Sequence, residues 1–191
     1  MRLFILAFSL VACAATAALA APDWLRPDAA YSATRVMRAG GHEISGPLHY
    51  DSGKERFEMT MEGARQIMIR REDKDRLYMI MPQMGMGMEI PLGGPQAMPS
   101  PDDYAELQPE EIGRETLHGE DVTKYRVEAN DAGESYSVFV WATDDGIPLR
   151  VEGESAEGRF EMEMRDLKRG PQPAELFEVP AGIQLMAMPA Q

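Results

Sequence analysis

Short runs of strict alternation between apolar and polar residues constrain the fold of this 191-residue chain most strongly. In residues 54–61, for example, Phe57, Met59 and Met61 alternate with polar side chains. A period of two residues is typical of a β-strand with one buried face, whereas an amphipathic helix repeats every 3.6 residues. Turn clusters such as Asp144-Asp145-Gly146 separate the runs, and such clusters favour tight hairpins between antiparallel strands.

The same pattern predicts strands over residues 31–39, 42–50, 54–61, 64–71, 76–81, 112–117, 121–129, 135–143, 147–151 and 159–167. Their short connections and the lack of a strand–helix–strand rhythm indicate a single, mainly β domain of about ten strands with little helix. An antiparallel sheet of this size covers its apolar face by curling, and an incomplete curl leaves a concave face that accepts an apolar ligand.

The first twenty residues have the composition of a secretory signal peptide. Arg2 is followed by an apolar run, and Ala18-Leu19-Ala20 matches a cleavage site. We therefore expect a periplasmic protein whose mature domain spans residues 21–191, with no integral membrane span. In an alternative interpretation, Leu10-Val11-Ala12-Cys13 is a lipobox, and the protein is a lipoprotein anchored through Cys13.

Residues 82–111 differ from the rest of the chain because they are rich in proline, glycine and methionine. Proline and glycine at this density disfavour a sheet interior, so we predict a long mobile loop that acts as a lid. Met84, Met86 and Met88, which are spaced by glycines, would form its apolar surface. Because soft thioethers favour Cu(I), the same three residues form an alternative Cu(I) site.

Composition and motifs argue against several functions. A net charge of -13 disfavours nucleic acids and anionic membranes as partners. The sequence has no glycine-rich phosphate loop and no zinc-ligand spacing, and two serine motifs, at residues 133–137 and 153–157, lack the last glycine of a nucleophile elbow. We therefore predict a protein that is not an enzyme, with no catalytic residues, no resident metal and no cofactor.

Three ordered motifs in the second half resemble a known family. They are the hairpin G-R-E-T-L-H-G-E-D-V-T-K-Y-R-V at 113–127, V-W-A-T-D-D-G-I-P-L at 140–149, and L-F-E-V-P-A-G at 176–182. Together they resemble an uncharacterised branch of the periplasmic LolA-like superfamily, the outer-membrane lipoprotein carriers and their relatives. This chain departs from the family at Thr123, where the branch often has cysteine, and in the Pro/Gly/Met-rich region, where the carriers have helices.

The resemblance implies a half-open antiparallel β-barrel with an apolar inner face, in a superfamily whose characterised members carry or sense acyl chains. We therefore predict a non-enzymatic binding protein for an acyl chain of a lipid or lipoprotein, or for another apolar small molecule. An envelope-signalling module that binds a protein partner is a further alternative. The residues that we expect in the groove are Phe57, Met59, Met61, Leu77, Met79, Met81, Phe160, Met162 and Met164. An ordinary packed core would use the same side chains.

Overall fold

The computed structural model describes residues 25–61, 63–92, 109–131, 134–155 and 158–187. The predicted signal peptide, Cys13 and residues 93–108 of the predicted loop lie outside these ranges. Within them, the chain forms one large sheet with short 3₁₀ turns.

The strands are β1 (Tyr31–Ala39), β2 (His42–Asp51), β3 (Lys54–Met61), β4 (Ala64–Arg71), β5 (Arg76–Met81), β6 (Met86–Pro91), β7 (Glu110–Leu117), β8 (Glu120–Asp131), β9 (Glu134–Thr143), β10 (Pro148–Ser155), β11 (Gly158–Arg169) and β12 (Gln184–Ala187). The 3₁₀ turns are η2 (Glu72–Lys74), η3 (Pro82–Met84) and η5 (Ala174–Phe177).

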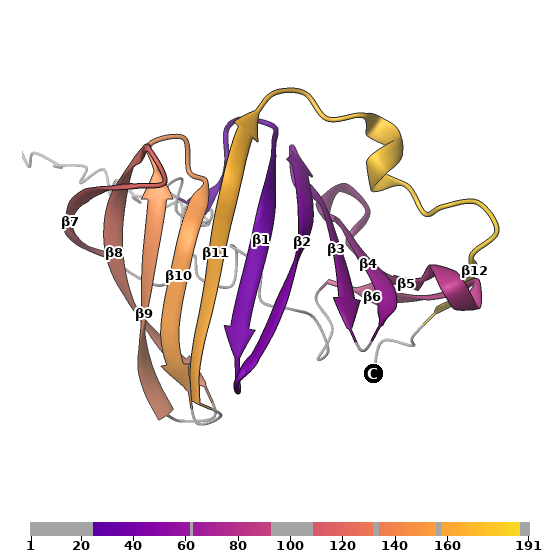
Figure 1. Ribbon diagram of the computed structural model, residues 1–191, viewed down its shortest axis with the longest axis horizontal. Coiled ribbons are helices and arrows are strands. Elements are labelled where there is room, and N and C mark those ends of the chain that lie inside the picture. The colour runs from indigo at the N-terminus through magenta and orange to yellow at the C-terminus, as the bar shows by residue number, and fades with distance from the viewer. Residues whose placement is uncertain (1–24, 62, 93–108, 132–133, 156–157, 188–191) are drawn as a thin grey trace, which may run out of the picture.

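The twelve strands follow the order β12-β6-β5-β4-β3-β2-β1-β11-β10-β9-β8-β7 (Figure 1). Two meanders, β1–β6 and β7–β11, are joined where β1 pairs antiparallel with β11. The last strand, β12, is parallel to β6. In the described part of the chain, the sheet ends at β7 and β12 without closing. The prediction of a mainly β, half-open architecture is therefore confirmed, with two strands more than expected.

Strand β6 corrects the prediction of a lid that begins at residue 82. The turn η3 ends at Gly85, whose φ of 64° suits glycine, and β6 then pairs with β5. Met86 and Met88 therefore belong to the sheet, while Met84 lies in η3 and is 61% exposed. Gly87 does not break the strand. It leaves room for the side chains of Ile183 and Leu185, which would lie within 3.3 Å of a Cβ at this position.

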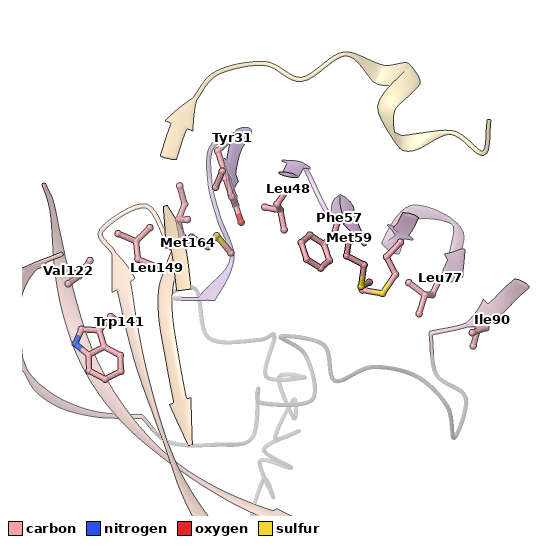
Figure 2. Packing of buried hydrophobic residues seen from close by; sticks show 13 residues of the cluster. Tyr31, Leu48, Phe57, Met59, Leu77, Ile90, Val122, Trp141, Leu149 and Met164 are labelled. Atoms are coloured by element: carbon pink, nitrogen blue, oxygen red, sulfur yellow. The ribbon is translucent and has the colours of Figure 1, made fainter. Parts of the chain in front are cut away.

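The two faces of the sheet carry different side chains. One face, called the inner face below, holds Tyr31, Leu48, Phe57 and Leu77, which are at most 3% exposed. These residues belong to the main hydrophobic cluster, whose members come from both halves of the sheet (Figure 2). Alternation along each strand places the intervening residues on the opposite, outer face.

The C-terminal strap, defined here as residues 171–187, covers part of the outer face. Phe177 is buried against Ile67, Ile69 and Ile80 of β4 and β5. The buried Arg71 guanidinium donates to the Phe177 carbonyl at 3.0 Å. The C-terminal strap thus covers the outer face of β4 and β5, so these two strands are buried on both faces.

Candidate functional site

A cavity of about 300 Å³ lies on the inner face. Its wall combines Leu77 of β5 with Val127 of β8 and Val138 of β9, so strands from both halves converge on one space. Leu25 and Pro27 close one side. This volume is at the lower end of the range of small-molecule sites, roughly 300–1,000 Å³. We call it the groove cavity.

The wall from the second half is apolar. Val140, Val151 and Met162 follow each other across β9, β10 and β11, because Val140 pairs with Val151 and Val151 with Met162. The next row places Phe160 beside Gly153, where a Cβ would overlap the aromatic ring. Gly153 therefore makes room for the ring of Phe160, which forms part of the wall.

An ion pair lies within the wall from the first half. The Arg35 guanidinium donates two hydrogen bonds to the Glu55 carboxylate, both of 2.8 Å, and the two side chains are only 13% and 22% exposed. Arg35 also stacks 5.2 Å from the centroid of Phe57. Burial has the largest single effect and lowers the pKa of Arg35, but the charge and the hydrogen bonds of Glu55, with a smaller contribution from Tyr31, together raise this pKa above its usual value. Arg35 therefore keeps its positive charge, which is paired with Glu55 inside the wall.

Two tyrosines line the cavity beside this pair. The rings of Tyr31 and Tyr50 stack with centroids 5.3 Å apart. Burial, and then the nearby Glu55 charge, raise the pKa of Tyr31 far above its usual value. Its phenol therefore stays protonated. The cavity thus offers a mainly apolar wall with a neutral polar region. In this region Arg35 is paired with Glu55 and Arg70 with Glu72, beside Tyr31 and Tyr50.

A second, smaller cavity of about 120 Å³ lies against β3–β6. Five of its lining residues are methionines, namely Met59, Met68, Met79, Met81 and Met88. We call it the methionine cavity.

The strand register places all nine predicted groove residues on the inner face. Leu77, Phe160, Met162 and Met164 line the groove cavity. Met59, Met79 and Met81 line the methionine cavity instead. Phe57 is fully buried in the core, and Met61 is 40% exposed. The predicted set is therefore divided between two cavities and the core.

Several wall residues escaped the sequence analysis. Val138, Val140 and Val151 looked like ordinary strand residues, although bulky side chains on both faces of residues 135–143 indicated a strand covered on each side. Arg35 is the wall residue that the sequence could have indicated most clearly. It is a charged residue on the same strand face as Tyr31 and Ala33, which are buried.

Two further observations concern the part of the chain that the structure describes. No group of three or more His, Cys, Asp or Glu side chains there could hold a metal ion. No helix in those ranges is long and apolar enough to cross a membrane. The Cu(I) site at Met84, Met86 and Met88 stays a prediction, with two of its residues in β6 and one in η3.

A family model described as "Domain of unknown function (DUF4412)" matches residues 36–145, more than half of the chain. The chain belongs to the DUF4412 family. The matched region runs from β1 to the turn after β9. It contains the whole lining of the methionine cavity and eleven of the twenty residues that line the groove cavity. No curated protein sequence is significantly similar to this DUF4412 chain.

Solved structures share its fold. MucB, in the complex of Pseudomonas aeruginosa MucA and MucB, is 18% identical with a TM-score of 0.57, and the match covers 85% of this chain and 59% of that chain. The DUF4412 chain thus spans less than two thirds of MucB. An uncharacterized conserved protein from Thermus thermophilus is 14% identical, with a TM-score of 0.58, and the match covers 84% of this chain and 91% of that one.

The LolA superfamily protein NE2245 from Nitrosomonas europaea is 14% identical to the DUF4412 chain, with a TM-score of 0.41 and coverage of 82% and 94%. At such identities the likeness concerns the fold alone. NE2245 is thus among the solved structures that the chain resembles in fold, and it comes from the superfamily that the sequence motifs resemble.

Proposed function

We propose that this chain is a non-enzymatic periplasmic protein that binds an acyl chain, a lipid or a comparable apolar ligand in the groove cavity. The observation that carries the proposal is the convergence of both halves of the sheet on one mainly apolar space of about 300 Å³. Sheets bury their apolar faces against another element. A half-open sheet that leaves such a space is suited to a ligand that completes its core.

The neutral polar region favours a ligand that is largely apolar. Arg35 and Glu55 satisfy each other's charge through two hydrogen bonds. An anionic headgroup that bound Arg35 would leave the Glu55 carboxylate without its partner in a partly buried site, which is costly. We therefore expect the apolar part of the ligand to occupy the cavity, with any charged headgroup near its mouth.

Native mass spectrometry of the protein purified from its own host tests the proposal. We expect a co-purifying apolar molecule and displacement of a bound fluorescent fatty acid by it. Met162→Glu should abolish both, because it places a charge in the cavity wall. Ile112→Glu is the matched control, since Ile112 lies on β7 and is 47% exposed.

A variant that fills the cavity separates lost binding from lost folding. Val151→Trp adds apolar volume to the wall without adding a charge, and it should weaken fatty-acid binding while the chain stays folded by circular dichroism. A ligand-free mass for the wild type, together with no fatty-acid binding, would contradict the proposal.

A protein partner is the second candidate. It is favoured by the shared fold with MucB, which has been solved in complex with MucA. For this chain, the partner would be an envelope protein. Cross-linking in cells followed by mass spectrometry tests this candidate, and one reproducible partner that is lost in Met162→Glu but kept in Ile112→Glu would support binding at the groove.

A further inference from the structure

The methionine cavity brings together five thioethers that are dispersed over thirty residues of sequence. Met59 comes from β3, Met68 from β4, Met79 and Met81 from β5, and Met88 from β6. The cavity volume of about 120 Å³ exceeds that of one water molecule in the liquid, which is about 30 Å³. The lining is thus rich in sulfur and encloses space for a small species.

Three of these methionines are direct cross-strand neighbours. Met68 pairs with Met79, and Met79 pairs with Met88. Side chains of directly opposite residues start about 4.5–5.5 Å apart at Cβ, and unbranched methionines reach across that spacing. Met59 is a diagonal neighbour of Met68, because Phe57 is the residue opposite Met68. Three thioether side chains therefore form one cross-strand row on the inner face, and Met59 lies diagonally beside one end of this row.

Burial provides both shelter and an entry route. Met59 and Met68 are 8% and 9% exposed, while Met79, Met81 and Met88 are partly exposed. An ion could therefore enter beside Met79 and Met88 and contact the buried sulfurs beneath.

Packing alone gives little reason for five methionines here. A methionine loses more side-chain entropy on burial than leucine or isoleucine, and β-branched residues suit strands better. The adjacent outer-face positions of β4 and β5 do use isoleucine, at Ile67, Ile69 and Ile80. Ile67 and Ile80 also contribute to the lining of the methionine cavity. The inner-face positions of the same strands carry Met68 and Met79 and still leave a cavity.

We propose that the methionine cavity is a binding site for Cu(I), with Met68, Met79 and Met88 as ligands and Met59 as a fourth, weaker one. Thioethers are soft ligands that select Cu(I) over harder divalent ions. They are neutral, so a monovalent ion keeps a single positive charge in the site, and the chain's net charge of -13 favours the approach of cations. This site shares only Met88 with the glycine-spaced set at residues 84–88.

Thioether ligands make a distinctive prediction about pH. Cysteine, histidine and carboxylate ligands must lose a proton before they bind a metal, so their affinity falls in acid. A thioether has no such proton. Cu(I) affinity at this site should therefore stay constant between about pH 5 and about pH 8, a range over which a histidine site would change.

Anaerobic titration of the full chain with Cu(I), against a coloured Cu(I) chelator, tests the proposal. We expect one Cu(I) per chain, a pH-independent affinity and an X-ray absorption spectrum dominated by sulfur neighbours. Met79→Leu with Met88→Leu should weaken binding at least ~tenfold, which corresponds to about 1.4 kcal/mol. Leucine conserves the volume, so the fold should be kept. Met84→Leu and Met162→Leu are the controls, since neither residue lines this cavity.

If the double variant does not fold, Met79→Leu and Met88→Leu are each measured alone, and each should weaken binding. Absence of Cu(I) uptake by the wild type overturns the proposal. So does an affinity that Met84→Leu reduces and Met79→Leu leaves unchanged, or a spectrum dominated by nitrogen or oxygen neighbours.

Discussion

Arg35 illustrates how a charged residue is accommodated inside an apolar face. The residue opposite it on β2 is Gly46, which has no side chain to obstruct the guanidinium. Arg35 thereby reaches Glu55 of β3, twenty residues away in sequence. Alternation in the sequence assigns Arg35 to the inner face, but it contains no information about which carboxylate meets it. That partner depends on how β1, β2 and β3 lie side by side, which is a tertiary property.

Asp145 gives a prediction about acid stability. The Arg169 guanidinium donates to its carboxylate at 2.6 and 3.0 Å, and the Thr143 hydroxyl donates at 2.6 Å. Arg169, aided by Thr143 and opposed by partial burial, lowers the pKa of Asp145 from 3.8 to about 2. A lowered pKa stabilises the fold above the unfolded value, and this stabilisation is lost as the pH falls from 3.8 towards about 2.

We therefore expect Asp145→Asn to lose less free energy of unfolding than the wild type over that interval, as measured by urea unfolding at each pH. Arg169→Gln should reduce the pH dependence in the same way, and the double variant should add nothing further. If the free energy of unfolding of Asp145→Asn fell with pH as steeply as that of the wild type, the ion pair between Asp145 and Arg169 would make no contribution to the pH dependence of stability.

At the scale of elements, the alternating pattern predicted most strands and the hairpins that join them, but it did not predict the long-range pairs β1–β11 and β6–β12. β1, β3, β4 and β5 have the predicted bounds, because turn residues stop each alternating run at a definite place. β6 and β12 were missed. β6 pairs with β5 in a local hairpin, but its glycine and proline residues resembled loop residues. β12 depends on its long-range pairing with β6, which no local pattern encodes. For the same reason, the predicted groove residues shared a face but not a cavity.

The close approach of β2 to β3 at Gly46 gives a prediction at this scale. A Cβ on Gly46 would overlap the carbonyl oxygen of Glu58, and a backbone oxygen cannot rotate away as a flexible side chain can. Gly46→Ala should therefore lower the free energy of unfolding by about 1–3 kcal/mol, the usual cost of overpacking. Ser45→Ala, at an exposed position of the same strand, should change it by at most about 0.5 kcal/mol.

Urea unfolding of the two variants side by side provides the measurement. Equal urea midpoints for Gly46→Ala and Ser45→Ala would mean that β2 and β3 can separate locally without cost, and would contradict the prediction.

At the scale of the whole molecule, the sheet is covered differently on its two faces. The C-terminal strap packs Phe177 onto Ile67, Ile69 and Ile80, and the Arg56 guanidinium holds the strap by donating to the Leu176 carbonyl at 2.9 Å. The inner face of the same strands faces the two cavities. The sequence motif at 176–182 marked this segment as part of the family pattern, yet its role as a cover for the outer face became clear only from the fold.

Removing the anchor of the strap should expose the outer face. Phe177→Ala deletes a side chain that is 1% exposed and should lower the free energy of unfolding by about 3–5 kcal/mol. We also expect stronger fluorescence of an apolar dye, because the isoleucines become accessible. Glu175→Ala, at an exposed position of η5, is the control. An unchanged melting temperature for Phe177→Ala would mean that the strap does not stabilise the sheet.

The position of β1 in the middle of the sheet has a consequence for the order of folding. β1 pairs with β11, which begins at Gly158, and the far edge at β6 pairs with β12, which begins at Gln184. During synthesis from the amino end, the first meander therefore has two unpaired edge strands, β1 and β6, until β11 and β12 have been made. Unpaired strand edges favour pairing with other chains. Such long-range pairing also slows folding. The native sheet can therefore be completed only late in synthesis. A factor that shields the edges of β1 and β6 until then would raise the yield of folded protein.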